Sequence, residues 1–214
     1  MAQIEVGFIG YDCIDMAIYL ARIFSASGKK TAIIDYTKKL NILRTASLPE
    51  ELEQTAGFYK KILVINGATD HRKDTEEQEV LVHYFGYHLE HPELKKCPNV
   101  VFATDMAKYN AQLLQDVELD ENAKAYLVVR NYTSFKYREK FLCQTMGRTF
   151  EAEKMILLPF DEADYKSGCY LCTDKKHRLT GLSGEMKTAL LNLFNGMSGV
   201  EYKRKEQAAF IRRA

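Results

Sequence analysis

The sequence predicts a doubly wound α/β domain, in which a mostly parallel sheet is flanked by helices. Short apolar runs alternate with helical patterns along the chain, and most of these runs are apolar on both faces. Strands of that kind are typical of buried parallel sheets. Their alternation with helices indicates right-handed crossover connections. The chain of 214 residues shows no internal repeat and no low-complexity linker, so we expect one core.

The expected elements follow from periodicity and from turn residues. Six runs are predicted as strands: Ile4–Ile9, Thr31–Ile34, Lys61–Ile65, Asn99–Ala103, Ala125–Val129 and Lys154–Leu158. Five segments are predicted as helices: Asp15–Phe24, Thr75–Leu89, Met106–Leu114, Ser134–Met146 and Glu185–Phe194. The second helix is inferred from an apolar stripe that follows an acidic first turn.

Charge and composition exclude several classes of function. Lys and Arg total 30 against 29 for Asp and Glu, so no strong nucleic-acid signal is present. The sequence shows neither the pattern of a secretory signal nor an apolar run that could span a bilayer, which predicts a cytoplasmic protein. Five scattered cysteines indicate reduced thiols rather than a disulfide framework.

We expect residues 1–200 to form the domain and residues 201–214 to form a basic C-terminal tail. The tail carries five cations, Lys203, Arg204, Lys205, Arg212 and Arg213. A surface helix or a frayed tail is favoured, because Phe210 and Ile211 supply too little apolar area to hold a membrane alone. A weak contact with a membrane surface, with recruitment to the membrane or a cell pole, stays open.

The ligand crevice of a doubly wound sheet lies at the carboxyl ends of its strands. The segments to consider are therefore those that follow the predicted strands: Gly10–Ile14, Asp35–Lys38, Asn66–Asp70, Thr104–Asp105, Asn131 and Pro159–Glu162. The first of them has the outline of a phosphate-binding turn between a strand and a helix.

The whole pattern resembles one family. The order of strand, glycine turn and helix in AIYLARIFSASGKKTAIID, followed by YKKILVING, NVVFATDM, AYLVVRNY and KMILLPFDEADY, resembles the MinD/ParA group of deviant P-loop ATPases over nearly the whole chain. The resemblance implies a P-loop NTPase-like fold with a nucleotide site at the first glycine turn. It is a resemblance of pattern rather than of a strict motif.

The phosphate loop itself departs from the family's K-G-G-x-G-K-[ST]-[ST]. Setting the family's helix on residues 17–21 places the loop on residues 8–15, where Gly10 alone matches. Phe8 and Cys13 replace the two lysines, and Ile14 replaces the hydroxyl that would hold Mg²⁺. Asp12 and Asp15 add negative charge, and one unit charge about 4 Å from a phosphate contributes roughly 4 kcal/mol of gross repulsion at an effective dielectric constant near 20. The loop is therefore interpreted as a degenerate Walker A loop.

Other positions that the resemblance brings into the nucleotide site are also changed. The second strand reads Ile-Asp35-Tyr-Thr instead of I-D-x-D, and Asn66 stands where the family carries a metal-anchoring Asp. Asn131 falls where the family often places an adenine-recognising Asn. The predicted vestigial or divergent nucleotide site comprises Gly10, Tyr11, Asp12, Cys13, Ile14, Asp35, Asn66 and Asn131.

The sequence therefore predicts a pseudo-ATPase without catalytic residues or a cofactor, which acts as a scaffold or localisation protein through protein partners or as a homodimer. Among family members it most resembles the divergent TadZ/CpaE-like proteins, which implies assembly or positioning of a pilus or secretion machine. Tyr11, Tyr36 and Tyr132 at predicted strand ends are candidate contact anchors.

A second hypothesis is a regulatory ATPase that binds ATP and Mg²⁺ through a non-standard loop. Its replacement cations would be Lys38, Lys39, Lys136 or Arg138.

No metal site is expected. Cys169 and Cys172 form a C-x-x-C pair near His177, but a structural zinc site needs four ligands and no second pair exists. His83, His88 and His91 lack the spacing of a metal-binding helix face, so surface or half-buried histidines are favoured.

Overall fold

A computed structural model describes residues 3–46, 56–134, 139–171 and 178–214, and the strands in these ranges form one sheet. Its strands are β1 (Ile4–Gly10), β2 (Thr31–Asp35), β3 (Ala56–Tyr59), β4 (Ile62–Asn66), β5 (Val80–Gly86), β6 (Asn99–Thr104), β7 (Lys124–Val129) and β8 (Met155–Leu157). They lie in the order β3-β4-β2-β5-β1-β6-β7-β8. Every pair is parallel except the β3–β4 hairpin, which confirms the predicted fold class.

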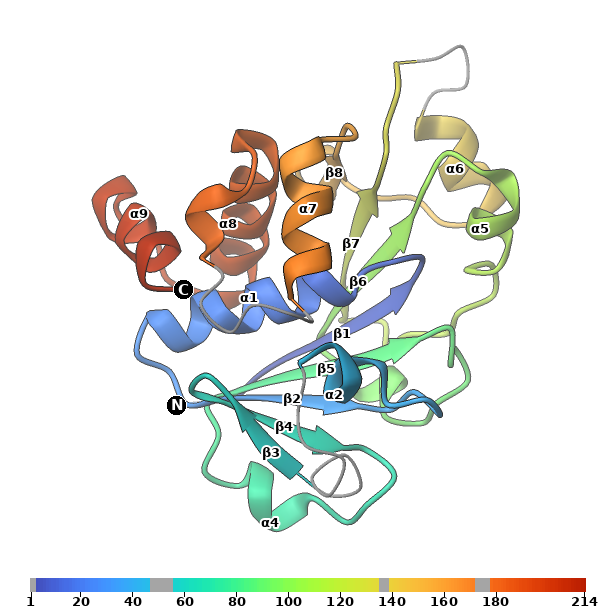
Figure 1. Cartoon of the computed structure of the whole chain (residues 1–214). Coiled ribbons are helices and arrows are strands. Elements are labelled where there is room, and N and C mark those ends of the chain that lie inside the picture. The colour runs from blue at the N-terminus through green and yellow to red at the C-terminus, as the bar shows by residue number, and fades with distance from the viewer. Residues whose placement is uncertain (1–2, 47–55, 135–138, 172–177) are drawn as a thin grey trace.

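Helices lie on both faces of this sheet (Figure 1). They are α1 (Ile14–Ala26), α2 (Asn41–Thr45), α4 (Arg72–Thr75), α5 (Lys108–Gln112), α6 (Glu139–Thr145), α7 (Glu162–Tyr170), α8 (Gly184–Ser198) and α9 (Arg204–Arg213). Short 3₁₀ turns span Leu94–Lys96, Ala152–Lys154 and Leu179–Gly181. None of the helices in the described part of the chain has the length and apolar composition that crossing a bilayer requires.

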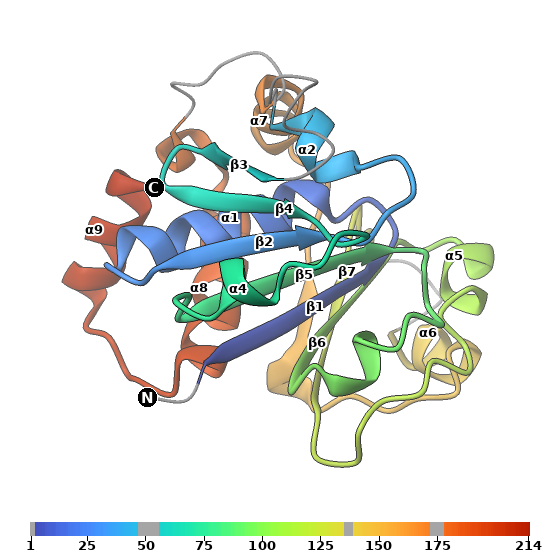
Figure 2. The same cartoon turned by 90° about the horizontal axis from the view of Figure 1, so that it is seen from below.

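Two hydrophobic clusters divide the core, one on each face. On the first face α1 packs against α8 and α9, and nine consecutive positions of α1, Met16 to Phe24, are buried. On the second face the core includes Ala111 of α5 and Leu142 of α6, packed with residues of β6 and β7. Seen from below, the short α4 is the helix, among those of the described residues, that lies over the region of β2 and β5 (Figure 2). Over β2 and β5, the second face is therefore covered largely by loops.

The prediction of a helix over Thr75–Leu89 is wrong. Val80–Gly86 forms β5, the strand between β2 and β1, and all seven of its residues are buried. A strand covered on both faces shows no alternation of apolar and polar residues, so its apolar positions also fit a helical stripe. With β5 and the unpredicted β3, the described sheet has eight strands, whereas six were expected.

The remaining elements agree in position and differ at their ends. The helix predicted over Met106–Leu114 is observed as the shorter α5. The helix predicted over Ser134–Met146 is observed as α6, and residues 135–138 lie outside the described ranges. Helices α2, α4 and α7 were not predicted from the sequence. The carboxylate of Asp161 caps α7 by accepting hydrogen bonds from two backbone N–H groups of its first turn, which is a local signal for a helix start.

Residues 201–214 include a helix that belongs to the packed structure. In α9, Phe210 and Ile211 are buried, and the Phe210 ring lies 5.7 Å from that of Phe194 in α8. The apolar residues that a lipid contact would need are therefore already used in the core. A weak membrane contact through this segment stays a prediction that would rest on its cations.

The turn that follows β1 depends on a glycine. Gly10 has a φ angle of +102°, and a Cβ atom at this position would lie 2.2 Å from the carbonyl oxygen of Ala103 in β6. The close approach allows the N–H of Tyr11 to donate a 2.8 Å hydrogen bond to that same oxygen. The first residue of the connection between β1 and α1 is thereby fixed to the neighbouring strand.

We predict that Gly10→Ala lowers the free energy of unfolding by about 3 kcal/mol, because it adds a backbone clash to the strain of a positive φ angle. Gly28→Ala is a matched control, since Gly28 has a φ angle of +97° and a Cβ atom added there would meet nothing within 4 Å. The control should lose only about 1 kcal/mol from strain. Equal losses in urea unfolding would contradict a close approach at Gly10.

Candidate functional site

The connection between β1 and α1 is three residues long, Tyr11 to Cys13. Phe8 and Ile9, which the family alignment assigns to the phosphate loop, belong to β1 and pair with β6. Ile14 and Asp15 belong to the first turn of α1. A P-loop cradles phosphates with the backbone N–H groups of a longer glycine-rich loop. Much less backbone is available for such a cradle here.

A buried ion pair occupies the start of α1. Arg130 follows β7, and its Nη1 and Nη2 atoms lie 2.5 and 2.9 Å from Oδ1 and Oδ2 of Asp15. Nη1 also donates to the backbone carbonyl oxygen of Asp12 at 2.5 Å. The two side chains are only 13% and 9% exposed. This bidentate, charge-assisted geometry is the strong form of an ion pair.

The electrostatics of this pair follow from its burial. Burial alone would lower the pKa of Arg130, but the charge of Asp15 and the hydrogen bonds to it outweigh burial and raise that pKa. Asp15 Oδ1 also accepts a 2.7 Å hydrogen bond from the N–H of Met16. A carboxylate of the chain itself thus lies at the positive end of the α1 dipole, where an anionic ligand would otherwise be favoured.

Asp12 and Cys13 complete the connection. Asp12 has a φ angle of +40°, and burial raises the pKa of its carboxyl group against the opposing effect of Arg130. Cys13 is fully buried, and burial, followed by the charge of Asp15, raises the pKa of its thiol. A neutral buried thiol supplies no positive charge for a phosphate.

Asp35 lies at the end of β2 and is committed to the backbone beyond it. Its Oδ1 atom accepts hydrogen bonds from the N–H and the hydroxyl of Thr37 at 2.9 and 2.6 Å. Its Oδ2 atom accepts from the N–H of Ile42 in α2 at 2.6 Å. Burial raises the pKa of Asp35, and these hydrogen bonds oppose the rise. The carboxylate therefore holds the turn into α2.

Asn66 lies away from the turn after Gly10, whereas Asn131 lines a cavity together with Tyr11 and Asp12 of that turn. Asn66 ends β4, which β2 and β5 separate from β1, so roughly 14 Å of sheet lies between the two strands. Its Oδ1 atom accepts a hydrogen bond from the N–H of Ala68. Asn131 follows Arg130, is exposed, and has a φ angle of +52°. Of the predicted site, Tyr11, Asp12 and Asn131 thus line one cavity, and Asp35 and Asn66 lie elsewhere.

Two adjoining cavities surround Arg130, and together they are called the crevice below. One, of about 240 Å³, lies toward α7 and is lined by Asp12, Asp15, Arg130 and Asp164 among others. The other, of about 180 Å³, shares Asp12, Arg130, Asp164 and Tyr165 with it and extends to Asn131 and Asp161. Each is smaller than the roughly 300 Å³ at which small-molecule pockets usually begin.

Helix α7 forms one wall of the crevice and is fixed at its first turn. Asp164 accepts hydrogen bonds from the N–H and the hydroxyl of Ser183, at 2.7 and 2.6 Å, which tie α7 to the start of α8. Among the described residues, the crevice lining contains four carboxylates, of Asp12, Asp15, Asp161 and Asp164, against the single guanidinium of Arg130. The formal charge of this described lining is therefore −3.

Aromatic side chains lie exposed at the rim. Phe160 and Tyr165 are 64% and 63% exposed, and their ring centroids lie 6.3 Å apart. Both line the smaller cavity together with Tyr11. Of the other aromatic anchors expected from the sequence, Tyr36 is buried on the second face, and the hydroxyl of Tyr132 donates to Glu139.

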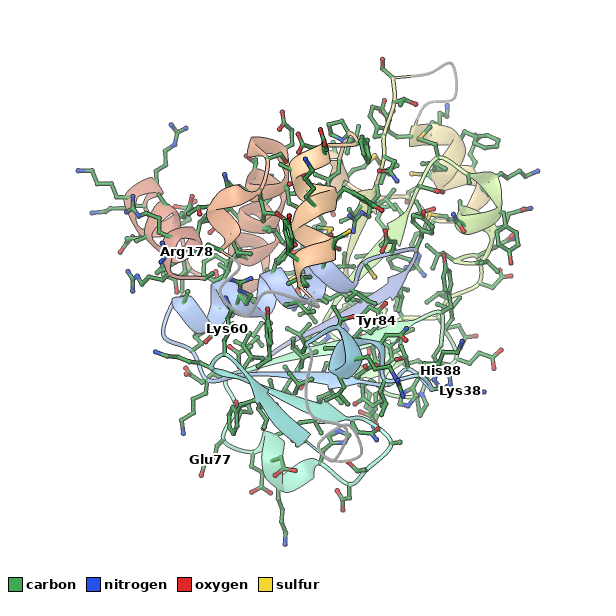
Figure 3. The ribbon with its side chains drawn as sticks, in the orientation of Figure 1. Lys38, Lys60, Glu77, Tyr84, His88 and Arg178 are labelled. Carbon is green, nitrogen blue, oxygen red and sulfur yellow. The ribbon has the colours of Figure 1, made fainter. Side chains whose placement is uncertain are left out.

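Arg130, Asp164 and the aromatic pair were not among the predicted site residues. The signal for Arg130 was its position directly after a strand, because such residues lie on the ligand-binding edge of the sheet. Of the replacement cations, Lys38 and Lys39 are exposed and line neither cavity, while Lys136 and Arg138 lie outside the described residues. Figure 3 labels Lys38, which lies on the connection between β2 and α2.

Cys169 is exposed on α7, while Cys172 and His177 lie outside the described ranges. Within the described part of the chain, no three His, Cys, Asp or Glu side chains gather as a metal site would require.

Solved structures with this fold are known, although no protein-family model and no curated protein sequence matches the chain. A ParA family ATPase from Chlorobium tepidum TLS aligns over 90% of this chain and 98% of its own, with a TM-score of 0.58 and 13% identity. The MinD cell division protein of Aquifex aeolicus aligns over 93% and 98%, with a TM-score of 0.59 and 11% identity. A chain of the MinC:MinD cell division protein complex of the same organism aligns over 94% of this chain and 99% of its own, with a TM-score of 0.58 and 11% identity. The chain therefore has the fold of the ParA and MinD ATPases, as the sequence resemblance implied.

Proposed function

We propose that this protein is a non-hydrolysing scaffold or localisation protein that uses the ParA/MinD fold to bind protein partners. The observation that carries the proposal is the buried pair of Arg130 and Asp15 at the start of α1. It fills the helix terminus with a carboxylate and a guanidinium that belong to the chain. A nucleotide would have to displace both groups before its phosphates could reach the backbone N–H groups.

Electrostatics support the same proposal. A triphosphate would enter a lining whose described residues include four carboxylates and one arginine that is already paired. The free energy of each close repulsion is of the order of several kcal/mol at low effective dielectric constants. The crevice is also divided into two cavities, and neither alone reaches the size at which small-molecule pockets usually begin. These properties favour a pseudo-ATPase over an enzyme.

The rim supports protein binding by a basic segment of the partner. Exposed aromatic pairs are typical anchors of interfaces, and Phe160 and Tyr165 lie beside the acidic lining. Arginine or lysine side chains combine attraction to carboxylates with cation–π contact on aromatic faces. Two copies of this crevice would bring like charges together, so a homodimer, if formed, would use another face. The positioning of a pilus or secretion machine, implied by the sequence resemblance, fits such a role.

The second candidate function is a regulatory nucleotide binder. The observation in its favour is the exposed Asn131 beside Tyr11 in the smaller cavity, where an adenine base could stack and donate hydrogen bonds. The phosphates of the nucleotide would then have to pair with cations outside the crevice lining. Among the described residues, Lys38 and Lys39 are the candidates.

Replacing Arg130 by Ala should lower the free energy of unfolding by about 3 to 5 kcal/mol, because Asp15 stays buried without its partner. Lys166→Ala is the control, since Lys166 pairs with Glu162 on the surface of α7 at 2.7 Å with both side chains mostly exposed. That loss should be about 0.5 kcal/mol or less. Chemical denaturation of both variants measures the difference. A loss at Arg130 no larger than at Lys166 would remove the main support for the proposal.

Millimolar ATP with Mg²⁺ should leave the melting temperature of the purified protein unchanged, because a ligand stabilises a fold only if it binds that fold. ATP without Mg²⁺ serves as the control for general ionic effects. A Mg²⁺-dependent rise in melting temperature that disappears in Lys38→Ala would instead favour the regulatory nucleotide binder. A rise that Lys38→Ala retains would contradict both the scaffold proposal and this assignment of the cation.

A fluorescently labelled oligo-arginine peptide should bind the protein at low ionic strength and be released as salt is added. The double variant Phe160→Ser, Tyr165→Ser should bind it roughly five- to tenfold more weakly, because two cation–π contacts are lost. Phe58→Ser, Tyr109→Ser is the matched control, since both of these aromatic side chains are 69% exposed on other elements. Fluorescence anisotropy measures the affinities. Equal weakening by both double variants, or equal binding of an oligo-glutamate peptide, would contradict a basic partner at this rim.

A further inference from the structure

Tyr36 lies at the centre of a polar and aromatic cluster on the second face of the sheet, apart from the crevice. Its ring stacks on Phe85 of β5 with a centroid distance of 4.8 Å and an interplanar angle of 5°. The ring passes directly over Gly67, where a Cβ atom would lie 2.4 Å from it. His83 and His91 also contact the Tyr36 ring, at centroid distances of 5.9 and 4.3 Å. Tyr36 is therefore held in one position by its surroundings.

A chain of hydrogen bonds runs through the Tyr36 hydroxyl. His71 Nδ1 lies 2.8 Å from the carbonyl oxygen of Thr69, and His71 Nε2 lies 3.4 Å from the Tyr36 hydroxyl oxygen. The same oxygen lies 3.4 Å from His83 Nδ1, and His83 Nε2 lies 3.2 Å from Glu5 Oε2. The chain Thr69–His71–Tyr36–His83–Glu5 is called the Tyr36 network below. It connects the loop after β4 with β2, β5 and β1.

The donors and acceptors in this network do not balance without an extra proton. A carbonyl oxygen only accepts, so His71 Nδ1 must carry a hydrogen, and Nε2 of a neutral His71 must then accept from the Tyr36 hydroxyl. That hydroxyl has one hydrogen, so His83 Nδ1 must donate to it. His83 Nε2 and the Glu5 carboxylate oxygen then face each other as two acceptors, and only one more proton can join them by a hydrogen bond.

The reverse arrangement has the same deficit at its other end. If the Tyr36 hydroxyl donates to His83 Nδ1, then His83 Nε2 can donate to Glu5 and both contacts are satisfied. His71 Nε2 then faces a hydroxyl oxygen whose hydrogen is used, and only a protonated His71 can donate to it. Every fully bonded arrangement thus holds one proton beyond neutral imidazoles and an ionised Glu5.

A neighbouring histidine outside the network, His91, resists protonation. His88 and His91 lie next to each other, with ring centroids 5.0 Å apart, and Glu93 and Cys97 lie on the segment that follows them. Burial, and then the neighbouring His88, lower the pKa of His91, although Glu93 opposes the shift. The unfolded chain therefore binds more protons at His91 as the pH falls, so the stability this residue contributes above about pH 6.5 is lost below it.

We propose that the Tyr36 network is a single-proton switch, in which one shared proton completes the bonds that join the loop after β4 to Tyr36, to His83 within β5 and to Glu5 in β1. The bound proton completes the chain from Thr69 to Glu5. Its loss leaves one contact between acceptors. If this contact is at His71, the loop loses its bond to Tyr36; if it is between His83 and Glu5, the loop keeps that bond. The switch extends from the carboxyl edge of the sheet, where Tyr36 and the loop after β4 lie, to Glu5 near the start of β1, and its state therefore affects how firmly the loop after β4 is held.

The test is an NMR titration of the histidine ring protons between pH 5 and 8, in the intact protein and in Tyr36→Phe. The substitution removes the hydroxyl and keeps the ring that stacks on Phe85. In the intact protein the signals of His71 and His83 should both follow a shared titration that is broader than a single-site curve. In Tyr36→Phe each should follow its own single-site curve. Tyr109→Phe, at an exposed tyrosine of α5, should leave the shared curve unchanged.

Identical curves for His71 and His83 in the intact protein and in Tyr36→Phe would overturn the proposal. If Tyr36→Phe does not fold, Glu5→Gln tests the other end of the network, because the Glu5 side chain is 32% exposed and its amide can donate to His83 Nε2. The variant then needs no extra proton, and both histidines should titrate independently. A shared curve that persists in Glu5→Gln would equally contradict the switch.

Discussion

The buried pair of Arg130 and Asp15 is the constraint on which the crevice depends. The helix dipole of α1 creates a place for negative charge, and Asp15 supplies it from within the chain. Arg130 then compensates that charge and also binds the carbonyl oxygen of Asp12, which fixes the three-residue connection. A helix terminus that binds ligand anions in related folds is here closed by two side chains, one that follows β7 and one from α1 itself.

The closed helix terminus also makes the electrostatic potential of the crevice negative instead of positive. Once Arg130 is neutralised by Asp15, the remaining carboxylates of Asp12, Asp161 and Asp164 set the potential of the crevice. Such a surface repels phosphates and attracts cations over a distance of about one Debye length, roughly 8 to 10 Å. In the proposed function, the chemistry of this edge therefore favours a basic partner over a phosphate.

The fold could be predicted from the sequence because most strands and amphipathic helices leave local signals. Strand β5 was missed because the apolar positions of a fully buried strand also fit a helical stripe. Gly10 was found through the turn it makes. Arg130 was missed because its role arises from a contact with Asp15 across 115 positions of sequence. Asn66 entered the predicted site because the sequence did not reveal that β2 and β5 lie between β4 and β1.

Two polar networks therefore reach the carboxyl edge of the sheet, and their chemistry divides their roles. An arginine stays charged throughout the physiological range, so the Arg130–Asp15 pair acts as a fixed element of the fold. Histidines change charge within that range, so the Tyr36 network is able to respond to the solution. The edge that would bind and hydrolyse a nucleotide in a catalytic relative can thus combine a permanent closure with a proton-sensitive loop, and neither element requires a bound phosphate.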